Sequence, residues 1–468
     1  MTQHDAYENA AAKAPPSLDA LADRVQGPVL RPGTEEYDRE QNGFQQAFRN
    51  DPVAVVGATG PGDVRAAVEY AAAHGLPVAL QATGHGLASV TERPLLVSTR
   101  RMTGVTVDPA ARTARIEAGV RWEGVIEAAA PHGLAPLSGS APNVGAISYL
   151  LGGGLGVLAR EFGYAADHVR SVDLVTAEGR ARHVTADSDP DLFWALRGAG
   201  ANFGAVTAVE VDLVPVASVQ GGGLHFDADL VPDVLRAFTA WSATLPDELT
   251  ASVSVLEYPD IPPMPEPLRG KYAAHVRFAY TGDAATLERL LKPLRDVGPR
   301  LIDDVGEIPY TESGRIYADP PVPHAYFGSN VLLDRLDADA LVAAAEAGGP
   351  GAPAGAVIDV RQLGGALRRR PEVPSAIGHR DAAYILRVLS ALDERGADAV
   401  RPVHEAVYAA VADATVGRRV NFIYGDRTTT EQVRDAYEPA DYRRLRELKR
   451  RYDPENLFRC TYNIPPAG

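Results

Sequence analysis

Short apolar runs alternate with helical patterns between about residues 50 and 216. Apolar side chains recur at helical spacing over 61–74, and Gly75 is placed to end that helix. Short strands are expected at 52–56, 76–80, 95–98, 105–107, 113–118, 172–176 and 206–213. Because strands and helices follow one another in this way, the pattern predicts a layered domain of mixed secondary structure.

The pattern of apolar and polar residues changes between about residue 217 and residue 414. β-Rich runs and amphipathic helices alternate there, with strands expected at 251–258, 272–279 and 357–363 and helices at 231–243 and 284–296. A charged helix is expected at 441–452, and a turn at Asp453-Pro454 leads into an extended tail. This change of sequence pattern indicates a second domain, which a short C-terminal segment follows.

Length and composition narrow the class of protein. A chain of 468 residues is too long for one hydrophobic core, and 46% hydrophobic with 23% charged residues is ordinary for a globular protein. The net charge of −15 argues against a nucleic-acid partner, and no apolar run is long enough to span a membrane. The single cysteine, Cys460, cannot form an internal disulfide, and the histidines lack metal-ligand spacing, so no metal is expected. We expect a cytoplasmic protein that begins with a loose arm over 1–48, because its start lacks the pattern of a secretory signal.

The densest glycine run is Gly152-Gly153-Gly154-Leu155-Gly156. Glycines let a backbone approach a ligand closely, although a turn with tight helix packing would use them equally well. Read as Gly154-x-Gly156-x-x-Ala159, with Glu178 further on, the run also fits a dinucleotide fingerprint and hence a nicotinamide-dependent reductase. Several strands precede the run, whereas that fold places its fingerprint after the first strand, which weighs against this alternative.

Other segments accompany the glycine run in a consistent order: Ser138-Gly139-Ser140, Val144-Gly145, Asp191–Gly198, Gly200–Thr207, Tyr452–Phe458 and Asn463-Ile464-Pro465. Together they resemble the FAD-linked oxidases of the vanillyl-alcohol oxidase superfamily, most closely the berberine-bridge-enzyme-like subfamily. The resemblance implies an α+β fold in which a two-part, PCMH-type FAD-binding domain carries an inserted substrate-binding domain, an antiparallel sheet flanked by helices. The implied boundaries are 1–48 for the arm, 49–217 and 416–468 for the FAD domain, and 218–415 for the insertion.

The resemblance also implies how FAD is held. His85 matches a family histidine that bonds covalently to the flavin 8α-methyl, and neutral imidazole is a competent nucleophile. Ala141 stands where many relatives place a second, cysteinyl link, so we expect a single covalent bond. Thr83 replaces the usual first glycine of the histidine loop. The implied FAD-binding residues are Thr83, Gly84, His85, Gly86, Ser138, Gly139, Ser140, Val144, Gly145, Gly152, Gly153, Gly154, Gly156, Gly204, Val206, Asn421, Tyr462 and Asn463.

The catalytic residues are harder to assign. Tyr149 matches a position beside the flavin N1–C2=O edge, where a phenol would donate to developing charge, and a packed core tyrosine is the alternative. Arg419 occupies the position of a family tyrosine base, and an arginine cannot act as a base. Candidates that remain for the base are Tyr424, Tyr384 and Tyr326, each of which can instead be structural. Gln362 is expected to face the substrate without acting as a base.

The resulting hypothesis is a covalent FAD oxidase of a hydroxylated small molecule in secondary metabolism. Hydride passes to flavin N5, a side chain takes the coupled proton, and molecular oxygen reoxidises the flavin. Ala146 matches a site where a small side chain favours access of oxygen. Flavin-dependent oxygenation or oxidative cyclisation on the same scaffold is the alternative, and the loss of the family base leaves room for a non-catalytic flavin-binding protein. The oligomeric state stays open.

Overall fold

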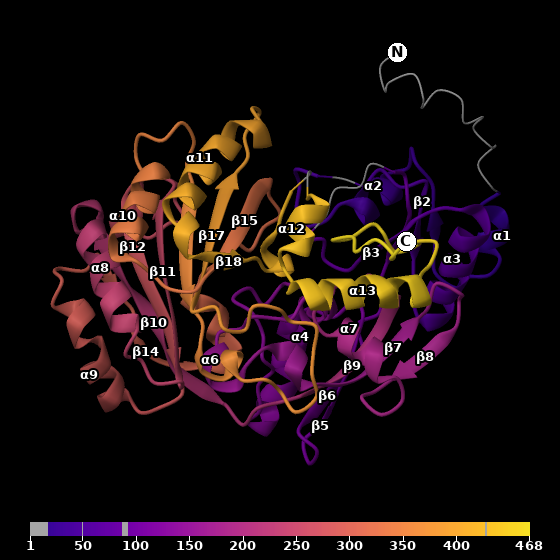
Figure 1. Ribbon diagram of the computed structural model, residues 1–468, viewed down its shortest axis with the longest axis horizontal. Coiled ribbons are helices and arrows are strands. Elements are labelled where there is room, and N and C mark those ends of the chain that lie inside the picture. Colours follow the sequence, from indigo (N-terminus) through magenta and orange to yellow (C-terminus); the bar gives the residue numbers. More distant parts are fainter. Residues whose placement is uncertain (1–16, 49, 87–91, 426–427) are drawn as a thin grey trace.

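The computed structural model describes residues 17–48, 50–86, 92–425 and 428–468. Mixed helices and largely antiparallel sheets form two halves that lie side by side (Figure 1). Two small sheets occupy one half, and a nine-stranded sheet with its helices occupies the other. This arrangement confirms the α+β class expected from the sequence. No helix among these residues is long and apolar enough to cross a membrane.

The first small sheet has the strand order β1-β2-β4-β3. Its strands are β1 (Val29–Leu30), β2 (Ala54–Gly57), β3 (Val78–Gln81) and β4 (Leu95–Ser98). Strands β2, β4 and β3 run parallel, and their buried apolar side chains explain why they read as continuous hydrophobic runs. Helix α3 (Pro61–His74) has the predicted bounds, because Gly75 adopts a φ of 67° and ends it in a left-handed cap.

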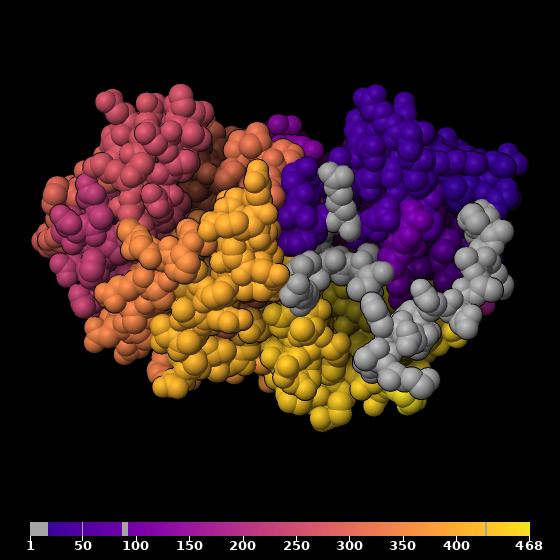
Figure 2. Space-filling view, turned by 90° about the horizontal axis from the view of Figure 1, so that it is seen from above, coloured from indigo at the N-terminus to yellow at the C-terminus, as the bar shows by residue number. Residues whose placement is uncertain are grey.

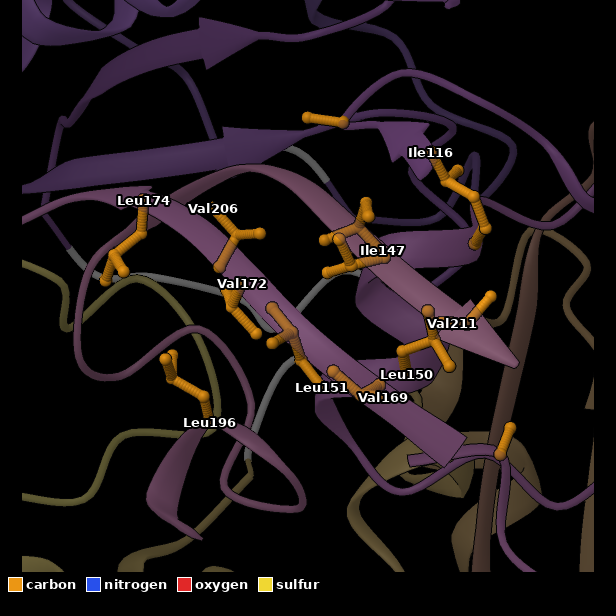
Figure 3. Close-up of a cluster of buried hydrophobic side chains, with 14 of the residues drawn as sticks. Ile116, Ile147, Leu150, Leu151, Val169, Val172, Leu174, Leu196, Val206 and Val211 are labelled. Carbon is orange, nitrogen blue, oxygen red and sulfur yellow. The ribbon is translucent and has the colours of Figure 1, made fainter. Parts of the chain in front are cut away.

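The second small sheet is antiparallel and has the order β5-β6-β9-β7-β8. Its strands are β5 (Val105–Asp108), β6 (Thr113–Glu117), β7 (Val169–Val175), β8 (Ala181–Val184) and β9 (Ala205–Asp212). Helix α5 (Ala146–Leu151) lies against it, and Figure 3 shows Ile147, Leu150 and Leu151 beside the valines of β7 and β9. The half also contains α4 (Trp122–Ala129), α6 (Ala159–Phe162) and α7 (Pro190–Leu196).

The nine-stranded sheet has the order β13-β10-β12-β11-β16-β17-β15-β18, with β14 also paired to β10. Its strands are β10 (Ser218–Asp227), β11 (Leu249–Glu257), β12 (Tyr272–Tyr280), β13 (Ile302–Asp303), β14 (Gly306–Pro309), β15 (Tyr326–Leu333), β16 (Val357–Gln362), β17 (Tyr384–Ala391) and β18 (Thr415–Gly417). Four helices cover one face: α8 (Val231–Ser242), α9 (Ala284–Arg295), α10 (Ala338–Ala347) and α11 (Ala397–Ala410). Because this sheet accounts for nearly the whole middle of the chain, we retain 218–415 as the proposed extent of an inserted domain.

The two faces of this sheet differ in chemistry. On β11, Val253 and Val255 pack with the helices, so Ser252 and Ser254 lie on the opposite face. That opposite face meets the first half, since Ala279 of β12 belongs to the same hydrophobic cluster as the two small sheets. A band of polar side chains is therefore buried between the halves.

The expectation of a loose N-terminal arm is wrong for residues 17–48. The segment forms α1 (Asp19–Ala22), β1 and α2 (Glu35–Gln41), and Leu21 is fully buried. The buried carboxylate of Asp63 accepts backbone N–H groups of Gln26 (2.7 Å) and Gly27 (3.1 Å), which ties the arm to the start of α3. Residues 1–16 lie outside the described part of the chain.

The C-terminal segment completes the first half. Helices α12 (Thr430–Arg434) and α13 (Pro439–Tyr452) lie along it in Figure 1, and Figure 2 shows the yellow C-terminal residues in the same half of the molecule as the indigo residues. Lys449 and Asp453 are fully buried, and Lys449 Nζ donates to Asp453 Oδ2 and to the Asn202 carbonyl, both at 2.7 Å. Asp453 in turn accepts the N–H groups of Leu457 (2.7 Å) and Phe458 (2.9 Å). This buried ion pair therefore fixes the start of the tail.

Replacing Lys449 with Met should destabilise the protein by about 3–5 kcal/mol, because Asp453 would be left buried without its counter-charge. Equilibrium unfolding in urea measures the loss. The exposed pair Lys292–Asp296 offers a matched control, since Lys292→Met removes the same kind of i,i+4 ion pair in water and should change stability by less than about 1 kcal/mol. Equal losses in the two variants would contradict a structural role for the buried pair.

Candidate active site

A cavity lies where the end of β3, helix α5 and the C-terminal tail meet. Its walls include Gln81, Ala82, Gly86, Ile147, Ser148, Leu151, Ala201, Val206, Asn421, Cys460 and Tyr462. Segments that are nearly 400 residues apart in the sequence thus line the same cavity. Four of the residues predicted to hold FAD are among them, namely Gly86, Val206, Asn421 and Tyr462.

His85 lies next to this cavity in a loop that is shaped by its neighbours. Gly84 has a φ of 70° and packs so closely on Gly43 that a Cβ would lie 2.5 Å from the Gly43 Cα. The imidazole stacks on Phe44, with 3.9 Å between ring centroids and 12° between planes. Phe44 therefore positions the ring, a contact that the sequence pattern does not predict.

The two nitrogens of His85 have different surroundings. Nδ1 lies 2.8 Å from the Thr83 hydroxyl oxygen, which also accepts the Gly145 N–H at 3.3 Å. Nε2 is buried and makes no hydrogen bond to the residues that the structure describes. Burial lowers the pKa of His85 to about 4, and the charge of Arg121 adds a smaller contribution in the same direction. A side-chain hydrogen-bond interaction with Asn143 opposes this shift but is weaker. The ring is therefore neutral at physiological pH.

The glycine run packs around side chains more than it faces the cavity. A Cβ on Gly152 would lie 1.7 Å from Asn421 Oδ1, and one on Gly154 would lie 2.5 Å from the Tyr149 ring. Gly139 and Gly156 likewise border Tyr149. Gly153 has a φ of 108° and leaves room for Ile377. The glycines thus let α5 and the tail come together.

The Tyr149 hydroxyl donates to the Leu137 carbonyl at 3.2 Å, and its ring packs edge-on against Trp122. Asn421 Nδ2 donates to the Tyr149 carbonyl at 2.9 Å, which links the tail to α5. Because the hydroxyl of Tyr149 donates to a backbone carbonyl, we interpret Tyr149 as a packed core tyrosine, the alternative to a catalytic role that the sequence left open.

Other residues predicted to bind the cofactor contact neighbouring protein groups instead. Ser138 is buried and its hydroxyl pairs with that of Tyr310 at 2.9 Å, whereas Ser140 donates to Asp319 at 2.6 Å. Gly204, with a φ of 157°, makes room for Leu174. Val144 packs at the edge of the core. These positions border the hollow without lining it.

The three candidate bases have different surroundings. Tyr384 points to the helix-covered face of its sheet, where its hydroxyl pairs with Ser242 at 2.9 Å, so it is excluded. Gln362 Nε2 donates to the Ser242 carbonyl on that same face, and the expectation that it faces the substrate is wrong. The alternation of β16 and β17 places both side chains away from the first half.

Tyr326 and Tyr424 do lie near His85. The Tyr326 hydroxyl donates to the His85 carbonyl, and burial raises the pKa of this phenol well above its usual value. Tyr424 packs edge-on against Tyr326, with 5.5 Å between ring centroids. Its hydroxyl makes no hydrogen bond to any described residue. Burial raises the pKa of Tyr424, while the charges of Arg387 and Arg361 act in the opposite direction.

Arg419, which occupies the position of the family base, is structural. Its guanidinium is buried and donates to the Gly378 carbonyl at 2.6 Å and to the Tyr164 hydroxyl. The arginine thus braces the segment 376–378 against the first half.

A buried cluster of charged side chains lies on the face of the large sheet that meets the first half, and the sequence analysis did not predict it. Asp359 is 1% exposed and accepts hydrogen bonds from three arginines, Arg277, Arg361 and Arg387. Burial favours the neutral acid, but the charges of the three arginines hold the pKa of Asp359 far below its usual range. Polar residues at alternate positions of β12, β16 and β17 were the available signal.

Comparisons with known proteins agree with this geometry. Residues 52–185 match the family described as FAD binding domain, and residues 420–465 match the family described as berberine and berberine like. An FAD-binding domain and a berberine-like segment, together with relatives that are FAD-linked oxidoreductases, identify the protein as an FAD-dependent oxidoreductase. The (R)-6-hydroxynicotine oxidase of Paenarthrobacter nicotinovorans is 29% identical, over 95% of this chain and 98% of its own. The chitooligosaccharide oxidase of Gibberella zeae is 24% identical, over 97% of this chain and 95% of its own.

Solved structures share the whole fold of this FAD-linked oxidoreductase. The 6-hydroxy-D-nicotine oxidase of Arthrobacter nicotinovorans superposes with a TM-score of 0.81 at 26% identity, covering 97% of this chain and all of its own. The xylooligosaccharide oxidase of Myceliophthora thermophila gives a TM-score of 0.84 at 23% identity, covering 96% and 99%. The fold excludes the alternative of a nicotinamide-binding Rossmann domain, since Gly154 follows a helix and Glu178 is exposed in the β7–β8 turn beside Arg180.

The cavity residues of this oxidoreductase fit FAD. Buried polar atoms without partners surround the hollow: Gln81 Oε1, His85 Nε2 and Asn463 Oδ1. Such atoms are costly unless a ligand satisfies them. At Gly86, a Cβ would lie 3.4 Å from the Tyr462 hydroxyl, so a larger side chain would narrow the entrance between loop and tail.

Replacing Gly152 with Ala should lower the amount of FAD bound by the purified protein at least about threefold, because the new methyl group would displace the amide of Asn421. The ratio of flavin to protein absorbance measures occupancy. Gly60→Ala is the control, since nothing lies within 4 Å of that position. Full occupancy in the Gly152 variant would show that Asn421 contributes little to the site.

Proposed function

We propose that the protein is a covalent FAD-dependent oxidase of a hydroxylated small molecule, with His85 as the single point of attachment. The observation that carries this proposal is the unpartnered, buried Nε2 of His85, next to a cavity walled by the FAD-binding loops and the berberine-like tail. When bound, FAD supplies the hydride acceptor, and reoxidation by molecular oxygen yields hydrogen peroxide.

The environment of His85 favours one nitrogen as the bonding atom. A neutral ring with its proton on Nδ1, donated to Thr83, has its lone pair on Nε2. The stack on Phe44 and the hydrogen bond from Tyr326 to the His85 carbonyl hold ring and backbone in place. We therefore assign the bond to Nε2, with Thr83 as the group that accepts the Nδ1–H hydrogen bond and so fixes the tautomer.

A second link is not expected. Ala141 has no nucleophile, and the Cys460 thiol, which does line the cavity, is kept protonated because burial raises its pKa to about 12. A thiol in that state is a poor nucleophile. One histidyl bond is thus the simplest arrangement for these residues.

Tyr424 is the proposed base. Of the tyrosines considered, it alone has a hydroxyl without a hydrogen bond to the described residues, whereas Tyr149, Tyr326 and Tyr384 use theirs on Leu137, His85 and Ser242. Burial raises the pKa of Tyr424, so the phenol predominates at neutral pH, while the charges of Arg387 and Arg361 favour the minor phenolate form. As the phenolate, the Tyr424 oxygen takes the proton of the substrate hydroxyl as hydride leaves.

The relatives support the class of substrate. Their names denote oxidases of a hydroxylated alkaloid and of oligosaccharides, which are hydroxylated small molecules of different kinds. On this ground we propose a hydroxyl-bearing substrate, in keeping with a role in secondary metabolism.

Acid precipitation tests the covalent bond. The pellet of the wild-type protein should stay yellow, and a peptide containing His85 should carry the mass of one FAD. His85→Ala should give a colourless pellet while retaining some non-covalent flavin. A colourless wild-type pellet, or a yellow pellet from the variant, would refute the assignment.

Thr83 variants separate the role of the tautomer from that of the fold. Thr83→Val keeps the volume and removes the hydroxyl, so covalent incorporation should slow, whereas Thr83→Ser should restore it. Apoprotein mixed with FAD and sampled over time by acid precipitation gives the rates.

Tyr424→Phe should lower kcat/KM by about 100-fold or more while leaving flavin content unchanged, because only the proton acceptor is lost. Since burial raises the pKa of Tyr424, wild-type activity should rise with pH across the neutral range and the variant should lose that rise. Full activity in the Tyr424→Phe variant would show that another group acts as the base.

Oxygenation on the same scaffold is the second candidate. The FAD-dependent monooxygenase FUP4 of Fusarium proliferatum is 34% identical over 47% of this chain. Oxygen-18 from labelled O2 should appear in hydrogen peroxide if the protein is an oxidase, and in the organic product if it is an oxygenase.

A further inference from the structure

Three polar side chains form a row across the face of the large sheet that meets the FAD-binding half. Arg277 on β12 is paired in register with Ser252 on β11, and Ser252 is paired with Arg361 on β16. Small Ser252 thus lies between two guanidinium groups. All three are buried, with exposed fractions of 6%, 0% and 4%.

The charge in this place is unbalanced. Arg277, Arg361 and Arg387 share Asp359 as their one buried carboxylate. Arginine stays protonated even when buried, and a buried charge without a counter-charge is strongly unfavourable. Three guanidinium groups thus share one carboxylate in direct contact, which leaves an excess of positive charge among the paired groups.

Groups on the neighbouring elements compensate the positive charge only in part. The ring of Tyr317 stacks on Arg277 and Arg361, each at 4.4 Å, and the charge of Asp319 also acts on Arg361. Asp319 is half-buried and accepts the Ser140 hydroxyl, and Asp304 is exposed and accepts the Gly223 N–H. His225 and His275, stacked next to the row, are neutral, because burial lowers the pKa of His225 to about 4 and holds that of His275 well below its usual value. Tyr424 is a neutral phenol at rest.

Several donors in the row are unused. Ser252 Oγ and Arg277 Nε are buried and have no hydrogen-bond partner among the described residues, and His225 Nδ1 is a third such atom. The contact of Arg361 with the Ser140 hydroxyl is long, at 3.5 Å. Unsatisfied donors that lie beside excess positive charge are what an oxyanion requires.

The row also lies next to the proposed catalytic groups. The Arg361 and Arg387 guanidinium groups lie 5.7 and 4.7 Å from the ring centre of Phe422. Phe422 follows Asn421, which lines the cofactor cavity, and both arginines influence Tyr424. A group bound by the row would therefore belong to the molecule that reacts there.

We propose that Arg277, Ser252 and Arg361 bind a carboxylate of the substrate, so that the hydroxyl compound oxidised by this protein is an acid. This inference rests on the proposed function, and it narrows the substrate to hydroxy acids or phenolic acids. Asp359 holds the arginines in place, and its own charge keeps the site from binding anions without selectivity.

The experiment compares acids with their own amides. The holoenzyme is titrated calorimetrically at pH 7 with acetate, benzoate, phenylacetate and 4-hydroxyphenylacetate, and with the primary amide of each. At least one acid should bind about tenfold or more tightly than its amide, because its charge completes hydrogen bonds to arginine. Arg361→Gln should remove that preference, and the exposed Arg289→Gln, with the same change of charge, should retain it.

Two results would overturn the inference: no acid binds better than its amide in the wild type, or Arg361→Gln keeps the preference. A shift in the pH profile of Arg361→Gln without any loss of acid preference would assign the arginines to Tyr424 alone. Because binding is measured without turnover, failure of the oxidase function would not imitate failure of the acid site. If Arg361→Gln does not fold, Ser252→Ala removes one donor and should lower acid binding about threefold or more, with amide binding unchanged.

Discussion

The contact between Tyr326 and the backbone of His85 is the point on which the site depends. The phenol comes from the first part of the long strand β15, and the carbonyl that it meets belongs to the loop after β3, 241 residues earlier. Gln45 reinforces the contact, since its side chain donates to the Tyr326 carbonyl at 2.8 Å and accepts the Tyr326 N–H at 3.3 Å. Phe44 and Thr83 of the first half hold the imidazole ring, and Tyr326 of the second half holds the backbone that carries it, so both halves contribute to the position of His85.

The polar face of the large sheet follows from the same docking. A sheet between helices and a second domain needs apolar residues on the helix side, and alternation then leaves the other positions free for chemistry. On β16 this separates Val360 in the helix-covered core from Asp359 and Arg361 opposite. Burial between the halves lowers the local dielectric, which is why one carboxylate can hold three guanidinium groups and why unpaired donors there are costly.

Local pattern was sufficient to predict many elements. Helix α3 has the predicted ends because its cap glycine is a local signal, and β4 has its predicted bounds because it is a short, wholly buried apolar run. Contacts over long sequence distances were beyond that reasoning: the folded arm at 17–48 depends on Asp63, and the stacking of Phe44 on His85 depends on where the loop after β3 comes to lie. The catalytic tyrosines show the same limit, because the face of Tyr384 was decided by strand register and the free hydroxyl of Tyr424 by its neighbours.

In the proposed site the arginines would act on both the substrate carboxylate and the base, and these effects would oppose each other. In the absence of a ligand, Arg361 and Arg387 favour the phenolate of Tyr424. A carboxylate bound at Arg361 would offset part of that positive charge and so raise the pKa of Tyr424 again. The proton would then be taken by a stronger base, which suits removal of a proton from a hydroxyl of high pKa. Asp359 sets the balance, since it already compensates one of the three charges before any ligand arrives. The selectivity of the site and the strength of its base are thus linked through one buried carboxylate.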